Sequence, residues 1–216
     1  MYDVLVLGGG IIGASTAYAL SRQGQHVLLL DRYAPGHEHG SSHGDGRIVR
    51  FNYTEDIYVK MAQLGFPAWE NLSRAAGKPL VQKTGIIEYG PVDSTPISLS
   101  EGNLKAQNIP YRTLSPEDAR QQFPHFDFAD DTRALHQASG SVAFATPAVE
   151  ALWRLIAETG SETAPQTTIV QIEAGDAQVT LRADDGAVYE GRKLVLAAGS
   201  WMKSLCAMLG ISLPLS

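Results

Sequence analysis

Apolar residues near the start of the chain form two short runs with a helical segment between them. The run Asp3–Leu7 ends in four consecutive apolar residues and is too short for an ordinary helix. Ala14–Gln23 has a helical composition, and Gly24 stands where a glycine commonly ends a helix. His26–Leu30 is the second apolar run. The pattern predicts a strand, a helix and a second buried strand.

A further helix is predicted where apolar residues recur at spacings of three and four, at Ile57, Met61, Leu64, Ala68 and Leu72. Pro67 lies inside this pattern, so we expect it to kink or split the helix. Thr146–Pro147 opens another helix, with an apolar face formed by Val149, Leu152, Trp153 and Ile156.

The remaining apolar runs are short and predict strands. They are Lys83–Gly90, Arg133–Ala143 with a break at Gly140, a β-meander of Thr168–Glu173, Gln178–Arg182 and Ala187–Glu190, and the buried Lys193–Ala198. The pattern predicts an α/β fold in which a Rossmann-like nucleotide domain carries an inserted mixed α+β region. We place the first part of the nucleotide domain at 1–80, the inserted region, as part of a substrate domain, at 81–143 and the second part of the nucleotide domain at 144–216.

The glycine turn after the first strand carries the clearest chemical signal. Gly8–Gly13 fits the template G-x-G-x-x-G, in which Gly8 allows the tight turn and Gly10 lets the backbone approach a pyrophosphate. Gly13 allows the helix to pack closely on the strand. The helix amino terminus offers free N–H groups and the positive end of its dipole to an anion.

Asp31 follows the second strand, 18 residues after Gly13. An acidic side chain at this place accepts hydrogen bonds from the ribose hydroxyls of an adenosine, and its charge disfavours the 2′-phosphate of NADP. The sequence therefore predicts an adenine dinucleotide site, with FAD and NAD both open.

Composition narrows the classes of partner. The chain has 216 residues, of which 44% are hydrophobic, and a net charge of −6 without a basic cluster, which argues against nucleic acid. No stretch approaches the ~20 consecutive apolar residues of a membrane span. The first strand begins almost at the first residue, so we expect no signal peptide. Cys206 is the only cysteine, which suits a reducing cytoplasm.

A polar loop, Tyr33–Gly46, holds four glycines and three histidines. His37, His39 and His43, together with Asp45, have a spacing that a metal site could use. The glycines between them favour a mobile loop and no second ligand cluster follows, so we predict no metal.

At this loop the sequence resembles flavin-dependent amine oxidases of the monomeric sarcosine oxidase and N-methyltryptophan oxidase type, within the D-amino-acid-oxidase group. The resembling segments are Gly8–Gly13 with Asp31, Gly40–Arg50, Lys83–Gly85, Ser139–Val142 and Lys193–Trp201. The family shows Gly-Ser-His-His-Gly-Asp-Thr-Arg where this chain has Ser42 for the first histidine and Gly46 for the threonine. Such enzymes are longer, so the chain resembles an amino-terminal half, and Cys206 does not match their flavin-linking cysteine.

The resemblance implies a catalytic group formed by Arg47, His43 and Arg50. It places His43 and Arg47 beside the flavin ring, where a guanidinium stabilises the negative charge of the reduced ring. Arg50 matches an arginine that pairs with the substrate carboxylate, for which a planar fork is suited. The alternative for both arginines is an ordinary salt bridge.

The resemblance also implies FAD as the cofactor and a set of binding residues. Val170 would contact the adenine through its backbone, with a plain core valine as the alternative, and Trp201 would flank the flavin or serve as a core tryptophan. The predicted cofactor-binding residues are Gly8, Gly10, Ile11, Ile12, Gly13, Asp31, Arg32, Ser41, Ser42, His43, Arg47, Ile48, Val170, Ala198, Gly199 and Trp201.

The function that this implies is oxidation of a secondary amine or N-methyl amino acid, with oxygen, to an imine and hydrogen peroxide. The expected partners are the small-molecule substrate, oxygen, and either the missing carboxyl-terminal half or a second copy. Three alternatives remain: an NAD-dependent dehydrogenase, a membrane-associated flavin dehydrogenase, and an inactive nucleotide-binding fragment.

Overall fold

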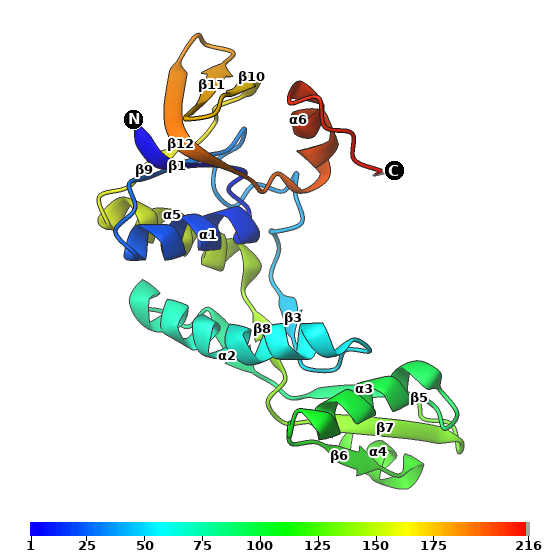
Figure 1. Cartoon of the computed structure of the whole chain (residues 1–216). Coiled ribbons are helices and arrows are strands. Elements are labelled where there is room, and N and C mark those ends of the chain that lie inside the picture. Colours follow the sequence, from blue (N-terminus) through cyan, green and yellow to red (C-terminus); the bar gives the residue numbers. More distant parts are fainter. Residues whose placement is uncertain (215–216) are drawn as a thin grey trace. The chain divides into compact units, whose positions relative to one another are not determined.

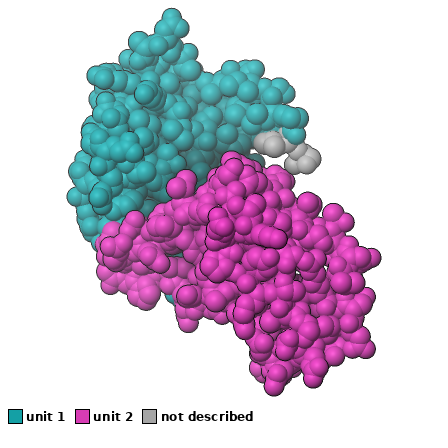
Figure 2. Space-filling model, turned by 60° about the horizontal axis from the view of Figure 1, so that its bottom comes forward, with its two compact units in different colours: residues 1–45, 144–216 teal, residues 46–143 magenta. Residues whose placement is uncertain are grey.

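A computed structural model describes residues 1–214 and divides the chain into two compact units (Figure 2). The first unit comprises Met1–Asp45 and the segment that begins at Phe144, and the second comprises Gly46–Ala143. The boundary predicted after residue 80 lies inside the second unit, because β3 (Arg47–Val49), β8 (Ser141–Ala143) and β4 (Val81–Lys83) share one sheet. The assignment of 81–143 to a substrate domain stays a prediction.

The first unit is built on a six-stranded sheet with the order β10-β11-β12-β1-β2-β9 (Figure 1). Its parallel strands are β1 (Tyr2–Leu7), β2 (Val27–Leu30), β9 (Glu162–Ala164) and the second half of β12 (Val188–Leu196). The antiparallel meander consists of β10 (Ile169–Ala174), β11 (Val179–Ala183) and the first half of β12. The predicted α/β class and meander are confirmed, whereas β9 was not predicted.

The meander and the parallel sheet share one continuous strand, which corrects the prediction of two separate strands. Val188–Gly191 pairs with β11, and Gly191–Leu196 pairs with β1. The change of partner occurs at Gly191, where an added Cβ would lie 2.7 Å from Leu5 Cγ. A glycine is required at position 191, where the two pairings meet, because a side chain there would collide with the Leu5 side chain.

Two helices of the first unit pack against each other, α1 (Ile11–Arg22) and α5 (Ala145–Glu158) (Figure 1). The apolar face predicted for α5 is buried: Val149, Leu152, Trp153 and Ile156 are each at most 5% exposed. A separate core cluster includes Leu5, Leu28 and Leu181, and residues around α6 (Met202–Met208) pack against it. These layers hold the carboxyl ends of β1, β2 and β12 side by side.

The second unit contains two small sheets and three helices. The sheets have the orders β3-β8-β4 and β5-β7-β6, where β5 is Ile86–Pro91, β7 is Thr132–Gln137 and β6 is Arg112–Leu114. The strand predicted at Lys83–Gly90 is in fact divided between these sheets. Gly85 has a φ of +72° there, and the N–H groups of Thr84 and Gly85 both donate to the Gly140 carbonyl at 3.1 and 2.8 Å.

Three helices accompany these sheets: α2 (Asp56–Ala76), α3 (Thr95–Ala106) and α4 (Pro116–Gln122). Helix α2 runs through Pro67 without splitting. Its predicted apolar positions Ile57, Met61 and Leu64 are 56%, 59% and 78% exposed, and Val59 is buried instead. The periodicity therefore identified the helix but not the side that packs.

No helix among residues 1–214 is both long enough and apolar enough to span a bilayer.

Candidate dinucleotide site

The turn between β1 and α1 needs glycine at its first and last template positions. Gly8 has a φ of +109°, and its N–H donates to the Leu30 carbonyl at 2.8 Å. An added Cβ on Gly8 would lie 2.5 Å from the Ala197 carbonyl oxygen, and one on Gly13 would lie 1.8 Å from the Gly8 oxygen. The turn is therefore packed against the backbone that follows β12.

Gly9 is held by two side chains from distant parts of the sequence. Its N–H donates to Asp31 Oδ2 at 2.6 Å, and its carbonyl accepts from Trp153 Nε1 at 2.9 Å. A Cβ on Gly9 would lie 2.1 Å from the Trp153 ring. Sequence reasoning treated Trp153 as core only. Gly9 itself could have indicated this contact. The template allows any residue at this position, so a glycine there suggests that another group fills the space of its side chain.

The Asp31 carboxylate lies at the carboxyl end of β2 and is fixed by the backbone. Its Oδ1 accepts from the Tyr33 N–H at 2.8 Å, and its Oδ2 accepts from Gly9. Each carboxylate oxygen keeps a second lone-pair direction, so Asp31 can still accept from a ribose diol. The binding of a ribose by Asp31 stays a prediction.

His37 stands beside this carboxylate, with Nε2 3.8 Å from Asp31 Oδ1. Its Nδ1 accepts from the His39 N–H at 3.1 Å. Because Nδ1 accepts this bond, a ring proton of His37 lies on Nε2, the nitrogen that faces Asp31. Sequence reasoning weighed His37 only as a metal ligand, and the structure assigns it to the surroundings of Asp31.

Ser42 reaches the start of α1 from the loop after β2. Its Oγ accepts from the Ile11 N–H at 3.0 Å, and a Cβ on Gly10 would lie 3.0 Å from the same oxygen. The first amide N–H groups of a helix have no intrahelical acceptor, and the Ser42 hydroxyl keeps its own proton for donation. The Ser42 hydroxyl therefore lies beside Gly10 and the amino terminus of α1, where the glycine motif predicts the pyrophosphate.

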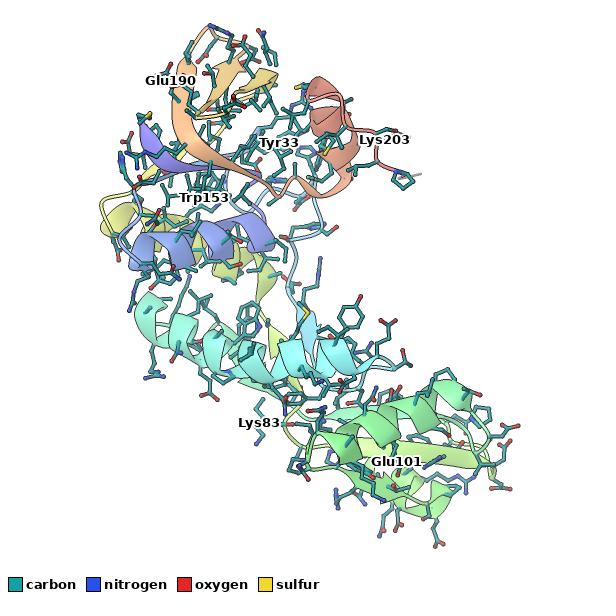
Figure 3. All side chains as sticks on the ribbon, viewed as in Figure 1. Tyr33, Lys83, Glu101, Trp153, Glu190 and Lys203 are labelled. Atoms are coloured by element: carbon teal, nitrogen blue, oxygen red, sulfur yellow. The ribbon has the colours of Figure 1, made fainter. Side chains whose placement is uncertain are left out.

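Aromatic rings gather beside Asp31. The Tyr33 ring lies 4.3 Å from His39, 4.8 Å from His37 and 5.9 Å from Trp201, measured between centroids, and Tyr33 is labelled in Figure 3. Trp201 closes the 3-10 helix Gly199–Trp201 after β12. The structure therefore brings the predicted residue Trp201 close to the loop that follows β2.

Ala198 and Gly199 follow the point where β12 leaves the sheet. The Ala197 N–H still donates to the Leu7 carbonyl at 2.8 Å, and Gly199 has a φ of +52°.

Val170 is 51% exposed, and the register between β10 and β11 shifts between Ile169 and Gln171. This irregularity surrounds Val170, whose predicted adenine contact stays a prediction.

Four more predicted binding residues of the first unit lie at its surface or in its loop. Ile12 is 69% exposed in the first turn of α1. Arg32 and Ser41 are exposed, and His43 is half-buried. The residue after His43 is anchored to α5, because the Gly44 N–H donates to Thr146 Oγ1 at 3.0 Å.

Arg47, Ile48 and Arg50 belong to the second unit. Arg47 is exposed and donates to the Gly46 carbonyl at 2.8 Å, and Ile48 is 65% exposed. The Arg50 guanidinium lies 5.0 Å from the centroid of the Tyr53 ring, and Tyr53 lies 5.7 Å from Tyr58. Two of the three predicted catalytic residues therefore lie in the second unit, and His43 lies in the first.

Within the part of the chain that the structure describes, no group of three histidine, cysteine, aspartate or glutamate side chains is placed to hold a metal ion.

The residues of the first unit fit the ADP portion of a dinucleotide. They supply a fixed carboxylate for the ribose, amide and hydroxyl donors for the pyrophosphate, and a glycine turn without side chains at the point of approach.

Comparisons with known proteins give matches along almost the whole chain. A family model described as FAD dependent oxidoreductase matches residues 3–216. Human peroxisomal sarcosine oxidase is 33% identical over 215 residues, which cover 100% of this chain and 55% of the relative. The N-methyl-L-tryptophan oxidase of Yersinia pestis (strain Pestoides F) is 30% identical over 212 residues, which cover 98% and 57%.

Solved structures share the fold. NikD, described as an unusual amino acid oxidase essential for nikkomycin biosynthesis, has a TM-score of 0.85 at 26% identity, with 97% of this chain and 54% of NikD covered. Glycine oxidase from Geobacillus kaustophilus has a TM-score of 0.84 at 21% identity, with 98% and 59% covered. The chain spans about half the length of the relatives it matches.

Proposed function

Because this chain belongs to the FAD dependent oxidoreductase family, we propose that the protein oxidises the C–N bond of a secondary amine or amino acid. The proposed substrate is an N-methyl amino acid such as sarcosine, and the proposed products with oxygen are an imine and hydrogen peroxide. The resemblance stated from the sequence is confirmed, and FAD is the cofactor of this family. The observation that carries the proposal is similarity to two N-methyl amino acid oxidases along the whole chain.

The first unit would hold the ADP part of FAD. Asp31 would accept from the ribose hydroxyls, while the amino terminus of α1 and the Ser42 hydroxyl would donate to the pyrophosphate. Bound FAD supplies a ring that takes up the hydride equivalent from the carbon next to the amine nitrogen. The protein contributes position and charge to that chemistry.

The arginines after the glycine-rich loop carry the proposed electrostatic roles. An arginine keeps its charge at working pH, so Arg47 is suited to stabilise negative charge on a reduced ring. Arg50 is half-buried against Tyr53, and its planar fork is suited to a substrate carboxylate. His43 completes the catalytic group that we propose. The cytoplasmic location and the use of oxygen stay predictions.

The first test is an absorption spectrum of the purified protein followed by acid precipitation. We expect the two visible bands of oxidised flavin, with the colour released into the supernatant if FAD is held without a covalent bond. A coloured pellet indicates covalent attachment. A colourless protein that binds ADP or NAD but not FAD contradicts the proposal and favours the nucleotide-binding alternative.

The second test is peroxide formation by the whole protein with sarcosine, N-methyltryptophan, proline and pipecolate. Dimethylamine is the matched control, because it keeps the secondary amine of sarcosine but lacks the carboxylate assigned to Arg50. We expect peroxide from at least one amino acid and much less from dimethylamine. Reduction of the flavin without peroxide would indicate a dehydrogenase that uses another acceptor, and no reduction by any of these amines would remove the substrate assignment.

A further inference from the structure

A tryptophan of the helical layer donates a hydrogen bond to the glycine turn, at the Gly9 carbonyl. Trp153 is 5% exposed on α5, and its Nε1 donates to this carbonyl at 2.9 Å. The two residues are 144 positions apart in the sequence. Figure 3 labels Trp153 on the side of the sheet that α1 and α5 cover.

The hydrogen bond fixes more than the Gly9 oxygen. In a planar trans peptide the carbonyl oxygen and the following N–H point in opposite directions. Because Trp153 holds the Gly9 oxygen, the Gly10 N–H is directed away from Trp153. Gly10 immediately precedes α1, so this N–H joins the free donors at the helix amino terminus.

We propose that Trp153 is a positioning residue for the cofactor pyrophosphate, which orients the Gly9–Gly10 peptide so that the Gly10 N–H faces the anion. The inference rests on the proposed binding of FAD and names a residue that it did not include. Three consecutive glycines give this turn wide backbone freedom. Without the indole N–H, the Gly9 carbonyl would be buried without its partner, and rotation of the peptide towards water would turn the Gly10 donor away.

A role in packing alone predicts different behaviour. Packing depends on the volume of the indole ring, whereas positioning depends on its N–H. Trp153→Phe keeps an aromatic ring on α5 and removes the donor. Trp69→Phe is the matched control, because the same change is made on α2 of the second unit.

The test measures the dissociation constants of ADP and adenosine for the cofactor-free protein by calorimetry, together with the unfolding midpoint. Trp153→Phe should weaken ADP by about tenfold, the usual effect of one hydrogen bond at a buried group. Adenosine, which lacks the pyrophosphate, should change by less than about twofold. Trp69→Phe should leave both constants unchanged.

Gly9→Ala provides a second, independent measurement. Its Cβ would collide with the Trp153 ring and displace the donor, so it should weaken ADP to a similar extent. If both substitutions act on one hydrogen bond, the double variant with Trp153→Phe should bind ADP no more weakly than the worse single variant.

Two results overturn the inference and are distinguishable from failure of the proposed function. Equal weakening of ADP and adenosine by Trp153→Phe would show a general structural role, and unchanged ADP binding would show no role. In both cases the parent protein still binds FAD. A parent protein that binds neither ADP nor FAD contradicts the proposed function and the inference together.

Discussion

At the scale of single residues, Asp31 combines a structural task with the ligand-binding task that we propose for it. Its two oxygens accept from the backbone N–H groups of Gly9 and Tyr33. Asp31→Asn replaces one acceptor by an NH₂ donor that faces a backbone donor, and it removes the charge. We expect a loss of about 1–3 kcal/mol in the free energy of unfolding and clearly weaker FAD binding, measured by urea denaturation and flavin titration.

The control for Asp31 is Asp3→Asn, the same change near the amino end of β1, whereas Asp31 follows the carboxyl end of the parallel strand β2. Asp3 Oδ2 accepts from one backbone donor, the His26 N–H at 2.9 Å, which an asparagine oxygen can replace. It should leave FAD binding unchanged. Equal effects of the two substitutions would contradict the assigned role of Asp31.

His136 on β7 has a pKa below its usual value, first because burial disfavours the charged ring and second because Arg112 places a positive charge beside it. The folded pKa therefore lies below the unfolded pKa of 6.5. The contribution of His136 to stability is fully present above pH 6.5 and decreases as the pH falls through the folded pKa. We expect the free energy of unfolding to decrease over this range, and His136→Gln to reduce the dependence on pH.

Arg112→Gln separates the two causes of this shift. It removes the positive charge beside His136 but leaves the ring buried, so the pKa should rise towards 6.5 without reaching it. The measurement is titration of the His136 ring protons by NMR. A pKa at or above 6.5 in the parent protein would contradict the prediction.

At the scale of elements, local signals in the sequence were sufficient where the cause of the element is local. The run Ser115-Pro116-Glu117-Asp118 is typical of a helix start, and the Ser115 Oγ accepts from the Asp118 N–H at 3.1 Å. The face of α5 was predicted because its neighbours lie on one side of it. β9 is three residues long and pairs with the distant β2, so no local pattern could indicate it. Its formation depends on tertiary contact.

In helix α2 the periodic pattern predicted the helix but not which of its apolar residues are buried. Val59 is fully buried, whereas Leu64 is 78% exposed. Val59→Ala should therefore cost about 1–2 kcal/mol in the free energy of unfolding, and Leu64→Ala should change it by less than about 0.5 kcal/mol. The larger side chain is the less costly to remove. Chemical denaturation of both variants tests this, and a larger cost for Leu64 would contradict the observed orientation of the helix.

At the scale of the whole molecule, the sequence indicated those residues of the candidate site that belong to the G-x-G-x-x-G motif and the acidic residue after it. Gly8, Gly10, Gly13 and Asp31 follow from a motif of 24 residues that ends at the second strand, since its geometry is local. The Trp153 contact joins positions 9 and 153, and the Ser42 contact joins positions 11 and 42. Such pairs depend on how α5 and the loop fold back onto the turn, which a pattern along one chain does not encode.

The division into two units gives a prediction for the molecule as a whole. ADP carries the part of the cofactor that we propose the first unit binds, and it lacks the flavin ring that we propose lies beside Arg47. At about 100 times its dissociation constant, ADP should stabilise the unit that binds it by ~2.7 kcal/mol. Hydrogen exchange should slow in β1, the glycine turn, α1 and the loop at Asp31, and stay unchanged in Gly46–Ala143. Equal protection of both units would contradict this assignment, because it would require the nucleotide to act on residues that hold none of the ADP-binding groups.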